Sequence, residues 1–132
     1  MKKLKLTTKT IMNLSAALLE IGNFKFKDAP LTFIMAIGKN TMALEPIVTL
    51  FEKTRQKIVK DCAKLDEDGN ILNTEDNSGV VLADPSKFAK DLEELYNVEH
   101  DVELTEFDQE RFESHPDITA NLMMSLSPII KE

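Results

Sequence analysis

The sequence has few of the residues from which catalytic, metal and phosphate sites are usually built. Its 132 residues include one cysteine, two histidines, four glycines and no tryptophan. The glycines at positions 22, 38, 69 and 79 lie too far apart for a phosphate-binding loop or a dinucleotide-binding fingerprint. The separations of Cys62, His100 and His115 match no zinc-binding spacing. The sequence therefore predicts no cofactor and no metal site.

Long hydrophobic runs and disulfide-forming cysteine pairs are also missing. No stretch reaches the roughly 20 consecutive apolar residues that a transmembrane helix needs. The N-terminal lysines are not followed by the apolar core of a signal peptide, because Asn13 and Ser15 interrupt the next apolar segment and Glu20 ends it. Cys62 alone cannot form a disulfide within the chain, so nothing indicates an oxidising compartment. We therefore expect a cytoplasmic protein that does not bind membranes.

Nucleophilic catalysis has no support in the sequence either. No Gly-x-Ser-x-Gly elbow occurs, and Cys62 lies on an apolar helix face, where burial as a small hydrophobic residue is the usual role. Carboxylates are abundant, but no apolar or aromatic pocket marks one of them for a raised pKa. The sequence thus predicts that the protein is not an enzyme.

Charge is distributed unevenly along the chain, whose net charge is −7. Residues 1–60 contain 11 Lys+Arg and 4 Asp+Glu, whereas residues 61–132 contain 5 and 19. Two interpretations are open: oppositely charged segments pack together within one fold, or the protein has two binding faces of opposite sign. We favour the first. The acidic balance argues against direct nucleic-acid binding.

Apolar periodicity predicts mainly helices. Thr7 or Thr8 can cap a helix that runs to Ile21, and a long apolar-rich segment extends over 31–65. Pro46 cannot donate to the helix ladder, so a kink or a fresh start is expected near 43–45. Asp84 followed by proline predicts the start of a further helix. A last helix follows a cap at Asp117.

Within the long segment, apolar residues recur every seven positions. Leu44, Phe51, Ile58 and Leu65 form one row, and Val48 begins a second. This spacing is typical of a coiled-coil seam, but it covers only about three heptads, which favours a helical hairpin inside the domain. The candidate seam consists of Leu44, Val48, Phe51 and Ile58.

Short strands complete the predicted fold. The alternation over 98–104 is the cleanest strand pattern in the chain, and shorter candidates lie at 4–6, 71–72 and 80–82. The prediction is one α+β domain over 1–132. It is helix-dominated, with a long helix kinked near Pro46, a helical hairpin and a small antiparallel sheet. It comprises a basic, mainly helical half (1–65) and an acidic α+β half (66–132).

Two further groups of residues are candidates for contact with a partner. The carboxylates of the acidic half could imitate a phosphate backbone, although a solvated acidic face is the simpler interpretation. These carboxylates are Asp91, Glu94, Glu99, Asp101, Glu103, Glu106 and Asp108. Four methionines could form an adaptable binding surface, but we expect them to fill gaps in the core. They are Met35, Met42, Met123 and Met124.

Three segments resemble a known family. They are EPIVTLFEKTRQKIVKDCAKLDEDGNI, VVLADPSKFAKDLEELYNVEHDVEL and LMMSLSPIIKE, within residues 44–132. Their order is similar to that of the DUF1617 family of small bacteriophage and prophage proteins. The resemblance implies a phage-encoded accessory protein in the host cell, without established activity or catalytic residues. The methionine-rich region 33–46 departs from the family.

Two functions follow as hypotheses. The first is a non-enzymatic interaction or assembly module that binds a phage or host protein, or a second copy of itself. The second is an acidic inhibitor of a host nuclease or another nucleic-acid-binding protein, acting through the carboxylates of the acidic half.

Overall fold

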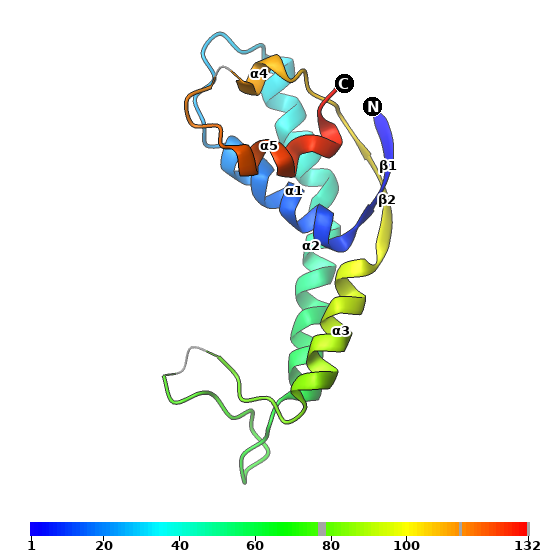
Figure 1. Ribbon diagram of the computed structural model, residues 1–132, viewed down its shortest axis with the longest axis vertical. Helices are drawn as coiled ribbons and strands as arrows, with labels where there is room; N and C mark the ends of the chain where they lie inside the picture. Colours follow the sequence, from blue (N-terminus) through cyan, green and yellow to red (C-terminus); the bar gives the residue numbers. More distant parts are fainter. Residues whose placement is uncertain (77–78, 114, 132) are drawn as a thin grey trace. The chain divides into compact units, whose positions relative to one another are not determined.

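The fold combines helices with one small sheet. The computed structural model describes residues 1–76, 79–113 and 115–131. In chain order the elements are β1 (Lys2–Thr7), α1 (Thr8–Ile21), α2 (Leu31–Cys62), α3 (Pro85–Asn97), β2 (Glu99–Leu104), α4 (Glu110–Glu113), α5 (Ala120–Leu126) and the 3-10 helix η1 (Ser127–Ile129) (Figure 1). The sheet is β1–β2, antiparallel. The predicted helix-dominated α+β class is confirmed.

The chain forms two compact units. Unit 1 comprises Met1–Val48 and Glu99–Glu132, and unit 2 comprises Thr49–Val98. Helix α2 contributes its N-terminal part to unit 1 and its C-terminal part to unit 2. The units therefore do not coincide with the basic and acidic halves, because unit 1 joins the basic N-terminal residues to the acidic strand β2.

The sheet of unit 1 pairs opposite charges. In the register of β1 and β2, Lys3 lies opposite Glu103 and Lys5 opposite Asp101, and all four residues are exposed. The alternate positions turn inward, so that Val102 and Leu104 are buried. This arrangement agrees with the interpretation that oppositely charged segments attract each other within the fold, since such cross-strand pairs stabilise a sheet.

Helix α1 forms the centre of the unit 1 core. The Thr7 side chain caps its first turn by accepting a hydrogen bond from the backbone N–H of Thr10, as predicted. One apolar stripe of the helix is fully buried. The residues of that stripe are Ile11, Leu14, Leu18 and Ile21. The helix ends as expected at Gly22, which keeps a right-handed conformation.

Asn40 fixes the return of the chain after β2. This residue of α2 is buried, and its side-chain amide donates to the carbonyl oxygen of Thr105 at 2.9 Å. The same amide accepts from the Thr105 backbone N–H at 2.8 Å. Asn40 thereby satisfies both backbone polar groups of Thr105, the N–H and the C=O. Neither an aliphatic nor a charged side chain could do this.

Two boundary predictions near the helix ends are corrected. The fresh helix start expected at 43–45 is wrong, because α2 continues through Pro46. Leu44 is fully buried and Ile47 packs against the core, so both sides of the proline are held by packing. The last helix is capped by Thr119, which accepts from the backbone N–H of Leu122, and not by Asp117.

Unit 2 is a helical hairpin. The C-terminal part of α2 and the helix α3 are joined by residues 63–84, in which isolated bridges replace the strands expected at 71–72 and 80–82. Asp84 caps α3 by accepting from the Lys87 backbone N–H at 3.0 Å, with Pro85 in the first turn, as predicted. Figure 1 shows α3 beside the C-terminal part of α2. The ring centroids of Phe51 on α2 and Tyr96 on α3 lie 5.2 Å apart.

Replacing Asn40 tests how much its hydrogen bonds to Thr105 stabilise the fold. We expect Asn40→Ala to lower the free energy of unfolding by about 2–4 kcal/mol, because both polar groups of Thr105 lose their partner. Urea unfolding followed by circular dichroism measures the change. Asn23→Ala is the control, since the Asn23 amide is exposed and donates only to the Leu19 carbonyl; its effect should stay within about 0.5 kcal/mol. Equal effects of the two variants would contradict this role of Asn40.

Candidate interaction surface

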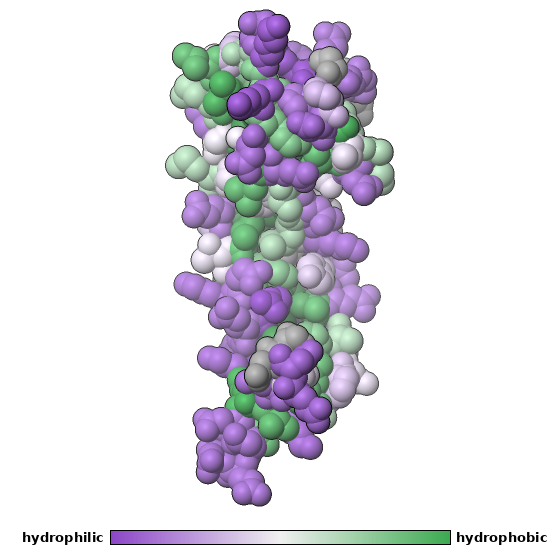
Figure 2. Space-filling view, turned by 90° about the vertical axis from the view of Figure 1, so that its left-hand side faces the viewer, coloured by the Kyte–Doolittle hydropathy of each residue, from purple (hydrophilic) through white to green (hydrophobic). Residues whose placement is uncertain are grey.

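The N-terminal part of α2 presents an apolar face to solvent. Residues 29–44 contain a single charge, Lys39. Leu31, Ile34, Met35 and Met42 have exposed fractions of 77%, 52%, 58% and 71%. Figure 2 shows exposed hydrophobic residues among hydrophilic ones on one side of the molecule. Because the outer face of a solvated helix normally carries charged or polar residues, this face is unusual.

A groove runs along this face between α1 and α2. Its volume is about 730 Å³, and its lining is mostly apolar. Leu19, which is 59% exposed, and Gly22 contribute from the end of α1. Gly38 lies on α2 between Ile34 and Met42, and a Cβ atom added there would meet no atom within 4 Å. The groove is therefore open at Gly38, where the backbone of another molecule could approach closely.

The expected core position of the methionines is wrong for three of the four. Met35, Met42 and Met124 are exposed, while Met123 is half-buried against the core. On α2 the core is contacted by the opposite helix face, which includes Phe33. Periodicity places residues on a common face, but it does not decide which of two apolar faces the rest of the chain covers.

The residues of the predicted helix seam are divided between the two units. Leu44 is fully buried in the unit 1 core, and Phe51 is buried in unit 2 beside Tyr96. Val48 and Ile58 are half-buried. Leu65, which would continue the heptad pattern, lies beyond the end of α2 and is 54% exposed.

The candidate carboxylates on β2 lie beside cations. Asp101 and Glu103 are opposite Lys5 and Lys3 across the sheet, whereas Glu99 is opposite Thr7. The two lysines reduce the net negative charge of this face of the sheet.

The remaining candidate carboxylates are divided between the two units. In unit 1, Glu106 lies 3.6 Å from the Lys2 ammonium group and Asp108 lies 3.6 Å from that of Lys131. In unit 2, Asp91 accepts a hydrogen bond from Lys87 at 3.1 Å, which raises the pKa of Lys87 above its usual value. Glu94 is exposed on α3. Five of the seven carboxylates thus lie beside a lysine or opposite one in the sheet, and Glu94 and Glu99 do not.

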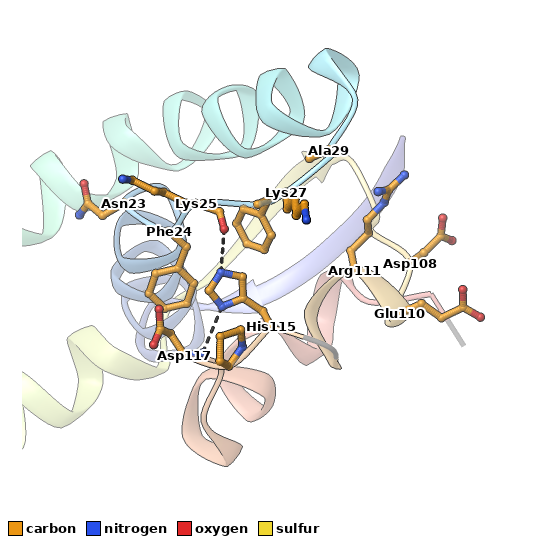
Figure 3. A pocket seen from close by; sticks show the side chains of 12 residues that line it. Asn23, Phe24, Lys25, Lys27, Ala29, Asp108, Glu110, Arg111, His115 and Asp117 are labelled. Carbon is orange, nitrogen blue, oxygen red and sulfur yellow. Dashed lines mark hydrogen bonds between the residues drawn. The ribbon is translucent and has the colours of Figure 1, made fainter.

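A second, more polar pocket of unit 1 surrounds His115. Its volume is about 790 Å³. The imidazole stacks on Phe24 with ring centroids 4.9 Å apart and meets Phe26 at the same distance. Nδ1 accepts from the backbone N–H of Asp117, so Nε2 carries the proton that it donates to the Lys25 carbonyl (Figure 3). Nε2 thus joins the loop of His115 to the loop of Lys25, whereas Nδ1 stabilises the turn at His115–Asp117 within its own loop.

Three of the charged side chains of this pocket, Asp108, Glu110 and Arg111, lie on the other side of it from the imidazole (Figure 3). The Arg111 guanidinium lies over the Phe33 ring, 5.8 Å from the ring centroid. Phenylalanine and lysine alternate over 24–27, a pattern typical of an extended chain, and nothing in it predicts contact with the distant His115. The signal that could have indicated an aromatic cluster is the presence of phenylalanines on both sides of the turn at 28–30.

The other potentially reactive residues, His100 and Cys62, have structural roles. His100 Nε2 lies 3.0 Å from the Thr8 hydroxyl oxygen, and Cys62 is buried in unit 2. Over 1–76, 79–113 and 115–131, no three His, Cys, Asp or Glu side chains lie close enough together to hold a metal ion.

Comparisons with known proteins add no relative. No family model matches this chain, and no curated protein and no solved structure matches it. Within the part of the chain that the structure describes, no helix combines the length and apolar character needed to cross a membrane.

The exposure of the groove can be tested by alanine substitution. We expect Met42→Ala to change the free energy of unfolding by less than about 0.5 kcal/mol, because the side chain is mostly in solvent. Leu44→Ala, two residues further along α2, should cost about 2–5 kcal/mol, because it leaves a cavity in the core. Thermal and urea unfolding of both variants measure the difference. A large loss of stability in Met42→Ala would show that the residue is buried.

Pairing of charges across the sheet can be tested by reversal. Asp101→Lys places like charges on opposite strands beside Lys5, and we expect it to cost about 0.5–1 kcal/mol. Adding Lys5→Asp should recover this loss, as a double-mutant cycle would show. Glu99→Lys, opposite a threonine, serves as the control and should have a smaller effect. The absence of coupling between positions 5 and 101 would contradict the role assigned to this pair.

Proposed function

We propose that the protein is a non-enzymatic interaction module that binds a protein partner in the groove between α1 and α2. The observation that carries the proposal is the outward face of α2, where large apolar side chains remain exposed along residues 31–42. Exposed apolar surface is costly in water unless a partner covers it for part of the protein's working life. A phage or host protein as the partner is part of the proposal and rests on the resemblance described above.

The shape of the groove suits an amphipathic helix. Two helices form its walls, and the apolar residues of α2 are spaced by three or four positions, as in helix-in-groove recognition. Met42 can adapt its side chain to different apolar surfaces, because it is unbranched and polarizable. Gly38 leaves room for a close approach of the incoming backbone. Three or four apolar side chains of the partner helix would provide most of the affinity.

The alternative of an acidic inhibitor receives less support. A phosphate mimic requires carboxylates that are not offset by neighbouring cations. Asp91, Glu106 and Asp108 each lie within 4.0 Å of a lysine ammonium group. Asp101 and Glu103 lie across the sheet from lysines. The arrangement of the described residues therefore favours the groove over the acidic face.

A photo-crosslinking experiment tests the groove. A crosslinking amino acid at Met42 should capture a specific partner protein in cells that express the chain, including phage-infected cells. The same amino acid at Lys9, which is exposed on α1 and does not line the groove, is the control. Adding Ile34→Asp should abolish capture from position 42, because a carboxylate would be desolvated in the complex.

The result can contradict the proposal in two ways. Capture that is equal from positions 42 and 9 would show that the groove is not a specific contact. Capture from position 42 that survives Ile34→Asp would show that the apolar wall of the groove does not carry the binding.

A further inference from the structure

Unit 2 has too little core for a hairpin of its size. Among its described residues only Phe51, Cys62 and Ala63 are buried. None of the 13 residues of α3 is buried, although four apolar residues share one face of this helix. Those residues, Phe88, Leu92, Leu95 and Tyr96, are all half-buried.

The C-terminal part of α2 shows the same pattern. Ile58 and Val59 remain half-buried, about two turns after the buried Phe51 and about one turn before the buried Cys62. A helix in a packed core normally buries such residues fully, because a second layer covers them. Helical hairpins this short seldom supply enough apolar burial to be stable without a metal, a disulfide or another chain. The half-buried residues therefore mark a face of the hairpin that lacks a second layer.

The charges of the hairpin indicate what can cover this face. Over residues 49–62, α2 carries four cations, Lys53, Arg55, Lys57 and Lys60, against Glu52 and Asp61. Helix α3 carries three carboxylates against two lysines. A second hairpin turned by a two-fold axis can lay its α3 beside this α2, so that opposite net charges become neighbours at both contacts. Packing α2 against a second α2 would instead bring the basic segments together.

We infer that unit 2 is a dimerisation element and that a second copy of this chain completes it as a four-helix bundle. Each hairpin supplies one layer, and the half-buried faces of α2 and α3 form the shared core. Arg55 suits the border of such a core, because its guanidinium is already bonded to Glu52 at 3.2 Å and its stem can cover apolar surface. This contact is independent of the groove in unit 1, so a failure of one proposal leaves the other standing.

The first test is the mass and exchange behaviour of the unaltered chain. Light scattering should give twice 14.9 kDa at high micromolar concentration and a lower mass on dilution. Hydrogen exchange measured at both concentrations should show that amides of 49–62 and 85–97 lose protection on dilution, whereas those of α1 do not. A chain that stays monomeric throughout would overturn the inference. So would a dimer whose concentration-dependent protection lies in α1 and the N-terminal part of α2.

A matched pair of variants localises the contact. Ile58→Asp should weaken dimerisation by about tenfold or more, because it desolvates a carboxylate in the shared core. Leu50→Asp makes the same chemical change at a side chain that is 58% exposed and lies about 80° around the helix axis from Ile58. It should leave the dissociation constant within about twofold. The reverse order of effects would overturn the inference. If circular dichroism shows that Ile58→Asp loses helicity, the hydrogen-exchange data on the unaltered chain decide whether unit 2 forms the dimer contact.

Discussion

The contact on which unit 1 depends is the pair of hydrogen bonds between Asn40 and Thr105. A buried amide in the middle of α2 holds the residue that directly follows β2. This fixes the position of the chain at the end of β2, after it has re-entered unit 1 at Glu99. Before this point β2 pairs with β1. After it, Phe107 and Phe112 enter the core, where their rings meet edge to face. A polar side chain thus specifies the position of a largely apolar core.

The pairing of β1 with β2 gives the uneven charge of the sequence a structural role. Strand β1 comes from the basic end of the chain and β2 from the acidic half, and the register sets their lysines and carboxylates opposite each other. Like charges would face each other if either strand paired with a second copy of itself, which disfavours aggregation through the sheet. The separation of positive and negative charge along the sequence, which could have indicated two binding faces, thus serves the pairing of strands within unit 1.

Helix α2 gives each unit one layer of packing and leaves one apolar surface uncovered in each. In unit 1 the inner face contacts the core, while Ile34 and Met42 on the other side line the groove. In unit 2 the seam around Phe51 is only partly covered by α3. Both proposals rest on the same physical constraint, since apolar area left in water must be offset by contacts with another surface.

The sequence by itself determined the local elements, including α1 with its Thr7 cap, α3 with Asp84 and Pro85, and the alternating strand β2. Each depends on residues a few positions apart, and such signals are readable along the chain. Tertiary packing alone determines which face of α2 is covered, that α2 continues through Pro46, and that the His115 ring stacks on Phe24. These outcomes depend on contacts between residues far apart in sequence. Periodicity gives the direction of a side chain on its helix, but the neighbours it meets are set by how the distant segments pack.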